Sequence, residues 1–369
     1  MHDKIRVVIS GGGTGGHIFP AIAIANAIKE IVPDADIRFV GAVGRMEMKR
    51  VPDAGYEIVG LPICGFDRKN MLKNVYVLWK ASVSIVKARK FVNTFSPHVA
   101  VGVGGYASGP LLWAASSMGV PCIIQEQNSY AGVTNKLLSK KVQKICVAYE
   151  GMERFFPKEK IMMTGNPVRD NVVRCQIDKA EACRRLGLDP DKKTILLVGG
   201  SLGARTINES VLNHLDIVKE SGVQFVWQTG KYYSASIKER LKGRDDLPML
   251  KVTDFISDIG EAYKASDLVI SRAGASSISE FCLIGKPVIL VPSPNVAEDH
   301  QTKNAMALSD KGAAILVKDS EAVDCLLATA VKLVNDEKQL EKLSRNVSSM
   351  AFKDSALKIA EEVIKTIRK

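Results

Sequence analysis

An apolar run that ends in glycines and then passes into a helical pattern occurs twice in this chain of 369 residues. The first copy, IRVVISGGGTGG, covers residues 5–16, and the second, ILLVGGSLG, covers residues 195–203. Glycines at a strand-to-helix turn tolerate positive φ angles and let a ligand approach the backbone, and the N–H groups of the first helical turn are donors for an anionic or strongly polar ligand. The repeat therefore predicts two similar α/β units.

Further apolar runs alternate with helical patterns along both halves of the chain. We expect strands at residues 5–10, 36–40, 99–103, 122–125 and 144–148, and again at residues 193–199, 224–228, 250–253, 268–271 and 288–291. Such alternation is typical of parallel sheets with helices on both faces. The predicted fold class is α/β, with two Rossmann-like domains whose parallel sheets face each other across a deep cleft at the carboxyl ends of the strands.

The length of the chain also indicates two domains, because one hydrophobic core rarely serves so many residues. A turn-rich stretch at residues 163–167 follows the fifth expected strand and is where we expect the boundary. The expected N-terminal domain is 1–164, joined by a C-terminal helix at about 350–369, and the expected C-terminal domain is 165–349.

Composition limits the class of partner. The longest apolar runs are too short to span a membrane and no secretory segment opens the chain, so we expect the protein to stay in the cytoplasm. The seven cysteines are scattered and form no C-x-x-C pair, which favours reduced thiols over disulfides or a metal site. A net charge of +11 favours phosphorylated substrates or an anionic membrane as partners. Nucleic acid is disfavoured, because no zinc-ligand spacing, RNP-like motif or dense basic arm is present.

The first glycine-rich turn matches a dinucleotide fingerprint only in part. Gly11, Gly13 and Gly16 satisfy G-x-G-x-x-G, but a dehydrogenase also needs an acid at the end of the second strand. That strand runs here into the sequence GAVG at residues 41–44, so a nicotinamide site is disfavoured. A purely structural turn would need one or two glycines rather than five, and it would leave His17 at the mouth of the turn without a role.

The stretch at residues 67–90 combines a basic composition with an amphipathic pattern. Its apolar residues at helical spacing are Leu72, Val75, Tyr76, Trp79, Val83 and Val86, and seven Lys or Arg stand against one acid. One interpretation is a surface for anionic lipid headgroups, with Leu72, Val75, Trp79 and Lys80 as membrane-association residues. The other is a helix packed on its own sheet with a solvated basic face. The stretch alone favours neither.

Eight short motifs occur in an order and at intervals that identify a family. They are GGGTGGHIFPA at 11–21, GGYASGP at 104–110, QEQN at 125–128, GNPVR at 165–169, GGSLGA at 199–204, DFI at 254–256, SRAGASSISE at 271–280 and HQTKNA at 300–305. Together they resemble the MurG family of bacterial N-acetylglucosaminyltransferases, within glycosyltransferase family 28. The resemblance covers nearly the whole chain.

The resemblance implies a GT-B fold and transfer of N-acetylglucosamine (GlcNAc) from UDP-GlcNAc to the 4-hydroxyl of the N-acetylmuramic acid of lipid I. The product would be lipid II for peptidoglycan synthesis, formed with inversion at the anomeric carbon and without a cofactor or essential metal. Neither half shows an Asp-x-Asp after a strand, which agrees with a metal-free site. The implied place is the cytoplasmic face of the inner membrane, as a peripheral protein on anionic phospholipid. Other cell-wall synthesis and division proteins are implied as partners.

The resemblance also implies roles for donor-binding residues. In the second half, Ser201 would bind the UDP phosphates, Glu280 both ribose hydroxyls, Ile256 the uracil through its main chain, and Gln301 the GlcNAc hydroxyls. From its sequence alone each has a plainer interpretation, such as a helix N-cap for Ser201, an exposed helix acid for Glu280 and a core residue for Ile256. Further donor contacts would come from Thr14, Gly15, Gly16, Asn128 and Arg169, the last as a cation near phosphate or else a surface helix arginine.

The acceptor and the general base are expected in the first half. Gly13 and Tyr106 would contact the acceptor, and His17 is the candidate for removing the proton of the attacking hydroxyl, because an imidazole titrates near working pH. Glu126 is a rival base. The family commonly carries His-Glu-Gln-Asn where this chain has QEQN at 125–128, so an essential histidine at position 125 is excluded.

By the same resemblance, the last helix should pack on the first domain. Its apolar face consists of Ala356, Ile359, Ala360, Val363 and Ile367.

Three other functions remain as alternatives. One is another GT-B enzyme, such as a soluble-acceptor glycosyltransferase or a UDP-GlcNAc 2-epimerase. The other two are a nicotinamide dehydrogenase and a non-catalytic basic membrane adaptor.

Overall fold

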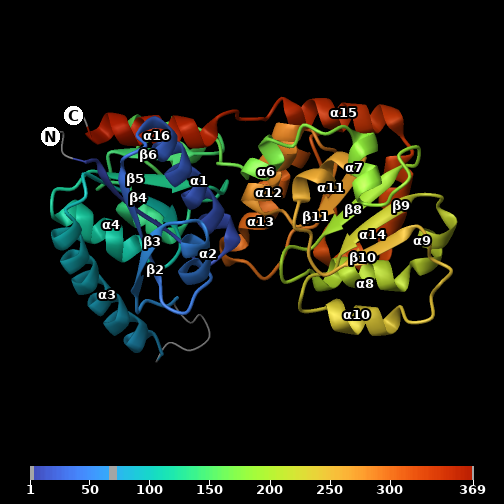
Figure 1. Ribbon diagram of the computed structural model, residues 1–369, viewed down its shortest axis with the longest axis horizontal. Coiled ribbons are helices and arrows are strands. Elements are labelled where there is room, and N and C mark those ends of the chain that lie inside the picture. The colour runs from blue at the N-terminus through green and yellow to red at the C-terminus, as the bar shows by residue number, and fades with distance from the viewer. Residues whose placement is uncertain (1–3, 66–72, 368–369) are drawn as a thin grey trace. The chain divides into compact units, whose positions relative to one another are not determined.

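The computed structural model describes residues 4–65 and 73–367, and its chain divides into two compact units (Figure 1). The first unit is Met1–Arg169 with Phe352–Lys369, and the second unit is Asp170–Ala351. The divisions therefore fall after residues 169 and 351, a few residues beyond the expected 164 and 349.

The first unit is built on a seven-stranded sheet in the order β3-β2-β1-β4-β5-β6-β7, in which all paired strands are parallel. Its strands are β1 (Arg6–Gly11), β2 (Asp36–Ala42), β3 (Glu57–Leu61), β4 (Val99–Gly104), β5 (Cys122–Glu126), β6 (Lys144–Val147) and β7 (Ile161–Met163). The order reverses between β1 and β4, and the carboxyl ends of strands at such a switch point are where α/β sheets bind ligands.

Helices cover both faces of this sheet (Figure 1). They are α1 (Gly15–Ile31), α2 (Glu47–Asp53), α3 (Lys73–Phe95), α4 (Ser108–Ser117), α5 (Val133–Leu138) and α16 (Ser355–Ile367), with two 3-10 turns at Met152–Arg154 and Lys158–Lys160. One core cluster joins α1 and α16 to β1 and β4, and the other joins α3 and α4 to the opposite face. The C-terminal helix α16 thus packs on α1 of the first unit, with Ile359, Ala360 and Val363 fully buried.

The second unit repeats this plan with a six-stranded sheet in the order β10-β9-β8-β11-β12-β13, again parallel at every pairing. The strands are β8 (Thr194–Val198), β9 (Gln224–Gln228), β10 (Leu250–Thr253), β11 (Leu268–Ser271), β12 (Val288–Leu290) and β13 (Ile315–Leu316). Its switch point lies between β8 and β11, the counterparts of β1 and β4.

The helices of the second unit are α6 (Asp170–Val173), α7 (Lys179–Arg185), α8 (Arg205–Asn213), α9 (Leu215–Glu220), α10 (Ser234–Arg240), α11 (Ile259–Ala265), α12 (Ala275–Ile284), α13 (His300–Ser309), α14 (Asp319–Val334) and α15 (Glu337–Ser348). A 3-10 turn at Ala297–Asp299 precedes α13. The two parallel sheets confirm the predicted α/β class with duplicated Rossmann-like units, and all ten expected strands are present. Three short strands, β3, β7 and β13, were not predicted.

The segments of the first unit that precede and follow the second unit pack closely against each other near Gly165. Gly165 adopts a φ of 74°, and a Cβ at this position would collide with Phe352 and Ser355. Glycine is therefore required here by backbone conformation and by space. The outgoing chain at Gly165 and the returning chain at Phe352 are in direct contact.

Helix α3 turns a different face to the core from the one that the amphipathic pattern indicated. Its buried residues are Val77, Ser84, Ala88, Val92 and Phe95. Tyr76, Trp79 and Val86 are exposed instead, at 56%, 60% and 67%, so α3 packs on the core of the first unit through a neighbouring face. Leu72 and the side chain of Val75 lie outside the described residues. Among the residues that are described, no helix combines the length and apolarity needed to cross a bilayer.

Candidate functional site

The glycine loop of the first unit connects β1 to α1 at the switch point of the sheet. Thr14 is the N-cap of α1 in an extended conformation, and Gly15 and Gly16 form the first helical turn. Gly13 has a φ of 83°, which favours glycine. The N–H of Gly12 donates to the carbonyl of Gly104, at the end of β4, over 3.2 Å. This places the predicted Gly13, Thr14, Gly15 and Gly16 where a ligand at the switch point would lie.

The imidazole of His17 is held against the backbone of its own loop. Its Nδ1 lies 3.0 Å from the carbonyl oxygen of Gly12. The Thr14 hydroxyl lies 3.5 Å from the same nitrogen, but the Gly12 carbonyl is nearer and can only accept, which favours a hydrogen on Nδ1 and makes Nε2 the basic nitrogen of the neutral ring. The Nε2 edge of the ring packs on Gly104, which has a φ of 107° and no room for a side chain. His17 is thus oriented as a proton acceptor through Nε2.

A buried acid that the motifs did not indicate lies beneath the glycine loop. Glu47, the first residue of α2, is only 1% exposed. Its Oε2 accepts the N–H of Gly13 over 2.8 Å and its Oε1 accepts the N–H of Ala42 over 3.0 Å. A Cβ at Gly12 or Gly41 would collide with this side chain. Glu47 therefore binds the β1–α1 loop to the end of β2.

Tyr106 lies in the β4–α4 connection and is 46% exposed. The guanidinium carbon of Arg45, an exposed residue of the β2–α2 connection, is 5.8 Å from the centre of the Tyr106 ring. Gly105, next to Tyr106, has a φ of 91° and approaches Gly12 so closely that a Cβ would collide with the Gly12 backbone. Tyr106, with Arg45 over its ring, therefore follows directly on a residue that packs against the glycine loop.

Glu126 ends β5 and is buried, and both carboxylate oxygens accept hydrogen bonds from the following loop and the start of α5. Its Oε1 accepts from the backbone N–H and the side-chain amide of Asn128, over 3.1 and 3.3 Å. Its Oε2 accepts from the N–H of Gly132 over 2.9 Å and from the amide of Asn135 over 2.8 Å. These bonds orient the half-buried Asn128, and they make the carboxylate a structural acceptor for the backbone and amides of residues 128–135.

The QEQN and GNPVR motifs meet in a buried amide network. The amide of Gln125 donates to the Oδ1 of Asn166 over 2.8 Å, and the amide of Asn166 donates to the carbonyl of Gln127 over 3.0 Å. Gln125 is fully buried, and its bond to Asn166 joins two segments of the first unit. Arg169 is half-buried and precedes α6, so it is not the surface helix arginine of the plainer interpretation.

Ser201 occupies a tight turn after β8 in the second unit. The N–H of Gly203 donates to the carbonyl of Gly200 over 2.9 Å, and both glycines have positive φ, at 84° and 88°. Helix α8 begins only at Arg205 with Ala204 as its N-cap, so the interpretation of Ser201 as a plain N-cap is wrong. The N–H of Lys231, beyond β9, donates to the Ser201 carbonyl over 3.2 Å.

Glu280 is fully buried in α12, so the interpretation of an exposed helix acid is also wrong. The hydroxyl of Tyr263, on α11, donates to its Oε2 over 3.1 Å. Ile256 is half-buried beyond β10, beside Phe255, whose carbonyl accepts the Thr253 hydroxyl over 3.0 Å. The motif had indicated Glu280, whereas nothing in the sequence indicated Tyr263.

Gln301 lies in the first turn of α13 and is half-buried. Its Oε1 accepts the N–H of Ser293 over 2.9 Å, which directs the opposite, NH₂ side of the amide elsewhere. At the end of β11, the guanidinium of Arg272 pairs with Asp319 and donates to the carbonyls of Val291 and Pro292 over 3.1 and 3.2 Å. Arg272 thereby connects the ends of β11 and β12 to the start of α14, and the sequence alone had not identified it.

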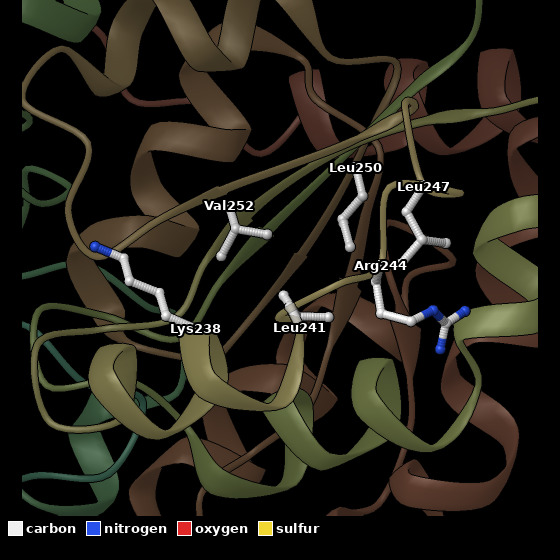
Figure 2. Close-up of a pocket in the computed structure, with 6 residues that line it drawn as sticks. All are labelled: Lys238, Leu241, Arg244, Leu247, Leu250 and Val252. Atoms are coloured by element: carbon white, nitrogen blue, oxygen red, sulfur yellow. The ribbon is translucent and has the colours of Figure 1, made fainter.

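A cavity of about 270 Å³ lies at the β10 edge of the second sheet (Figure 2). Leu241, Leu250 and Val252 converge in it, while the charged ends of Lys238 and Arg244 extend away in opposite directions. None of its described lining residues belongs to the predicted sites. Over residues 4–65 and 73–367, no group of three or more His, Cys, Asp or Glu side chains is arranged to hold a metal ion.

Two family models match the chain, one for each half. The N-terminal domain of glycosyltransferase family 28 matches residues 7–147, and the C-terminal domain of the same family matches residues 194–359. These ranges contain β2 to β6 and all of β1 but Arg6 in the first sheet, and all strands of the second.

Similar proteins cover the chain from end to end. A Phocaeicola vulgatus protein called UDP-N-acetylglucosamine--N-acetylmuramyl-(pentapeptide) pyrophosphoryl-undecaprenol N-acetylglucosamine transferase is 64% identical over 99% of this chain and 97% of its own length. A Bacteroides thetaiotaomicron protein of the same name is 63% identical, over 99% and 98%.

Solved structures agree with the two-unit architecture. The crystal structure of Acinetobacter baumannii MurG has a TM-score of 0.75 at 26% identity, over 98% of this chain and 99% of that one. A UDP-GlcNAc 2-epimerase from Neisseria meningitidis has a TM-score of 0.68 at 14% identity, over 98% and 100%, and this likeness concerns the fold alone. From the two matching domain models and the full-length relatives, the chain belongs to glycosyltransferase family 28.

Proposed function

We propose that this enzyme transfers GlcNAc from UDP-GlcNAc to the 4-hydroxyl of the N-acetylmuramic acid of lipid I, giving lipid II for peptidoglycan synthesis. The observation that carries the proposal is the 64% identity, over 99% of the chain, to a relative named for this transfer. Most of the site residues expected from the sequence follow β1, β4 and β5 in the first unit and β8, β10 and β11 in the second, while Arg169 follows β7 and Gln301 follows β12. The carboxyl ends of the strands are where doubly wound sheets bind ligands.

The donor is proposed to bind mainly to the second unit. The turn that carries Ser201 would bind the diphosphate, with its exposed hydroxyl and backbone N–H groups as donors. Glu280, held by Tyr263, would accept the ribose hydroxyls, and Ile256 would bind uracil through its main chain. Gln301, whose Oε1 is already engaged, would donate to a GlcNAc hydroxyl.

Further donor contacts are proposed from Thr14, Gly15, Gly16, Asn128 and Arg169. Transfer needs no metal in this proposal, since fixed N–H dipoles and polar side chains can stabilise the charge that develops on UDP. A comparison of turnover with and without a chelator tests this point.

The acceptor is proposed to bind beside the glycine loop of the first unit, with Gly13 and Tyr106 among its contacts. His17 is our choice for the general base, because its Nδ1–H is bound to Gly12 and its Nε2 is basic. Glu126 is better described as the residue that orients Asn128, because four donors occupy its carboxylate.

The chemical step follows from these assignments. The acceptor O4 attacks the anomeric carbon of GlcNAc from the face opposite UDP, so the configuration inverts. As the O4–C1 bond forms, the C1–O bond to the β-phosphate breaks and its electron pair leaves with UDP. The proton of O4 passes to Nε2 of His17.

Helix α3 is proposed to contact an anionic lipid surface at the cytoplasmic face of the inner membrane. Tyr76 and Trp79 stack at 5.8 Å with 15° between their planes, and both are exposed. The ammonium of Lys80 lies 4.6 Å from the Tyr76 ring centre. On the neighbouring α4, Trp113 is 37% exposed and Lys141 lies 5.5 Å from its ring. Exposed aromatic rings next to lysines are suited to a headgroup layer. Cell-wall synthesis and division proteins are further proposed partners.

A transfer assay with labelled UDP-GlcNAc and a lipid I analogue tests the function. Wild type should form a labelled lipid product, His17→Ala should lower turnover with little change in UDP affinity, and Glu280→Ala should weaken UDP binding. A Glu126→Ala variant that binds UDP normally but does not turn over, beside an active His17→Ala, would reassign the base. Acceptor-independent conversion of UDP-GlcNAc to its 2-epimer, without lipid product, would replace the proposal by the epimerase alternative.

A further inference from the structure

Glu47 and His17 are bonded to opposite ends of the same peptide group. The carbonyl of Gly12 accepts from Nδ1 of His17 over 3.0 Å, and the N–H of Gly13 donates to Oε2 of Glu47 over 2.8 Å. These two groups belong to one planar amide, in which a trans arrangement points the C=O and the N–H in opposite directions. The sequence of contacts is therefore carboxylate, peptide group, imidazole.

We propose that Glu47 is a positioning residue for His17, acting through the Gly12–Gly13 peptide. In serine hydrolases a carboxylate binds the histidine directly, orients it and selects the tautomer whose other nitrogen is basic. Here the peptide group lies between the carboxylate and the ring. By fixing the N–H of Gly13, Glu47 fixes the direction of the Gly12 carbonyl, and that carbonyl favours a hydrogen on Nδ1 of His17.

The surroundings of this peptide leave it little freedom. Gly12 also donates its N–H to the Gly104 carbonyl over 3.2 Å. The second oxygen of Glu47 is bound to Ala42 over 3.0 Å, so the carboxylate itself cannot rotate without losing a bond to β2. Glu47 occupies space that side chains at positions 12 and 41 would otherwise fill, so glycine is needed at both positions.

Charge strengthens the chain of bonds. A carboxylate accepting from an N–H forms a stronger bond than a neutral acceptor does, and hydrogen bonds in series polarise one another. The negative charge of Glu47 thus increases the electron density on the Gly12 carbonyl. It favours the Nδ1–H tautomer and stabilises the imidazolium that His17 becomes after taking a proton.

The substitution Glu47→Gln isolates this effect. Each carboxylate oxygen of Glu47 accepts one backbone N–H, so either orientation of the amide directs its NH₂ group at a donor. The variant keeps the size of the side chain but loses the charge and at least one bond. Glu362→Gln is a matched control, because Glu362 is another buried acid of the first unit, on α16.

Nitrogen NMR on protein labelled with ¹⁵N-histidine reads the tautomer directly. The chain has five histidines, and the signals missing from His17→Gln identify those of His17. Neutral His17 should be the Nδ1–H tautomer in wild type and in Glu362→Gln, and a mixture in Glu47→Gln. A wild-type ring protonated at Nε2, or an unchanged tautomer in Glu47→Gln, would overturn the proposal. If the Gln variant does not fold, the wild-type spectrum still tests the premise, because a neutral His17 protonated at Nε2 would overturn the proposal.

A double-mutant cycle supplies the kinetic test, and this part rests on the proposed function. Glu47→Gln should lower kcat about tenfold per folded molecule, with the KM for UDP-GlcNAc nearly unchanged. In a His17→Ala background the same substitution should have no further effect, because its path to the substrate has been removed. Equal losses in both backgrounds would mean a general structural role. A wild type without transfer activity would refute the proposed function and leave the NMR result to stand by itself.

Discussion

Two buried glutamates of the first unit show how surroundings give the same side chain different tasks. Glu126 accepts four hydrogen bonds from residues 128–135, a loop and the start of α5, and therefore stabilises the shape of that segment. Glu47 divides its two oxygens between two segments that are far apart in sequence, at Gly13 and Ala42. Removing either carboxylate would leave backbone N–H groups without an acceptor, at about 1–3 kcal/mol for each buried donor.

A lysine in the second unit makes stability depend on pH. The ammonium of Lys286 donates to the Ser266 carbonyl over 2.5 Å. Burial lowers the pKa of Lys286 to about 8, and the nearby Asp267 carboxylate opposes that shift only in part. Between that pKa and the usual lysine value the unfolded chain holds more protons than the folded one, so stability rises with pH in this window.

We therefore expect wild type to gain stability relative to Lys286→Met as the pH rises. Between about pH 7.5 and about pH 9.5 the difference in unfolding free energy should change by about 2 kcal/mol in favour of wild type, at about 1.4 kcal/mol per pH unit above the folded pKa. Urea unfolding of both proteins at the two pH values measures it. A difference that does not change with pH would mean that Lys286 titrates normally.

At the level of single residues, the sequence identified those that stand in motifs and missed those that act across the fold. Glu280 was indicated by the motif ending at 280, but its partner Tyr263 lies on another helix. Glu47 was missed because its partners, Gly13 and Ala42, meet only in the folded sheet. The absence of an acid at the end of the second strand was read correctly, and the acid five residues further on binds protein backbone instead.

At the level of elements, the sequence predicted buried strands well and edge strands poorly. The central β1, β4, β8 and β11 are runs of apolar residues because helices cover both faces of the sheet. The missed β3, β7 and β13 lie at or beside sheet edges and are short, and β3 mixes Glu57 and Gly60 with its apolar residues. Their pairing comes from neighbouring strands, which no local pattern records.

Helix α3 illustrates a different limit. The helical spacing indicated one apolar face, but the structure buries an overlapping face, and periodicity does not say which of two such faces a sheet covers. The structure buries Val77, Ala88 and Val92 and exposes Tyr76 and Trp79. The exposed face then needs another environment, and the adjacent lysines favour an anionic one.

The double variant Trp79→Ser/Lys80→Gln should bind anionic phosphatidylglycerol vesicles more weakly than wild type by at least about tenfold. The loss combines about 1 kcal/mol for the lysine with the apolar transfer energy of the indole ring. Turnover of a short-chain, water-soluble acceptor should remain unchanged. Vesicle flotation and the transfer assay measure the two quantities.

A control for this comparison is Val173→Ser/Lys242→Gln, which removes one exposed apolar and one exposed basic residue from the second unit. It should bind vesicles as wild type does. Equal vesicle binding by both double variants and wild type would count against α3 as the lipid-contacting element.

At the level of the whole molecule, no core cluster of the described residues is shared between the units, and each unit has its own switch point. Because the proposed uridine and diphosphate contacts lie mainly in the second unit, UDP should protect that unit first. Hydrogen exchange with saturating UDP should slow most at residues 199–204 and 271–285, with residues 11–17 affected less. The greatest protection at residues 11–17 would instead assign the diphosphate to the first unit.

The second unit is one continuous segment, Asp170–Ala351, which in the sequence lies between the two segments of the first unit. The two flanking segments of the first unit meet where Gly165 lies against Phe352. Such an arrangement makes the inserted segment exchangeable as a cassette, since a relative's copy would need to match only two neighbouring junctions. Preference for a nucleotide sugar could then diverge in evolution, or be altered by grafting, while α16 continues to complete the core on which the acceptor side is built.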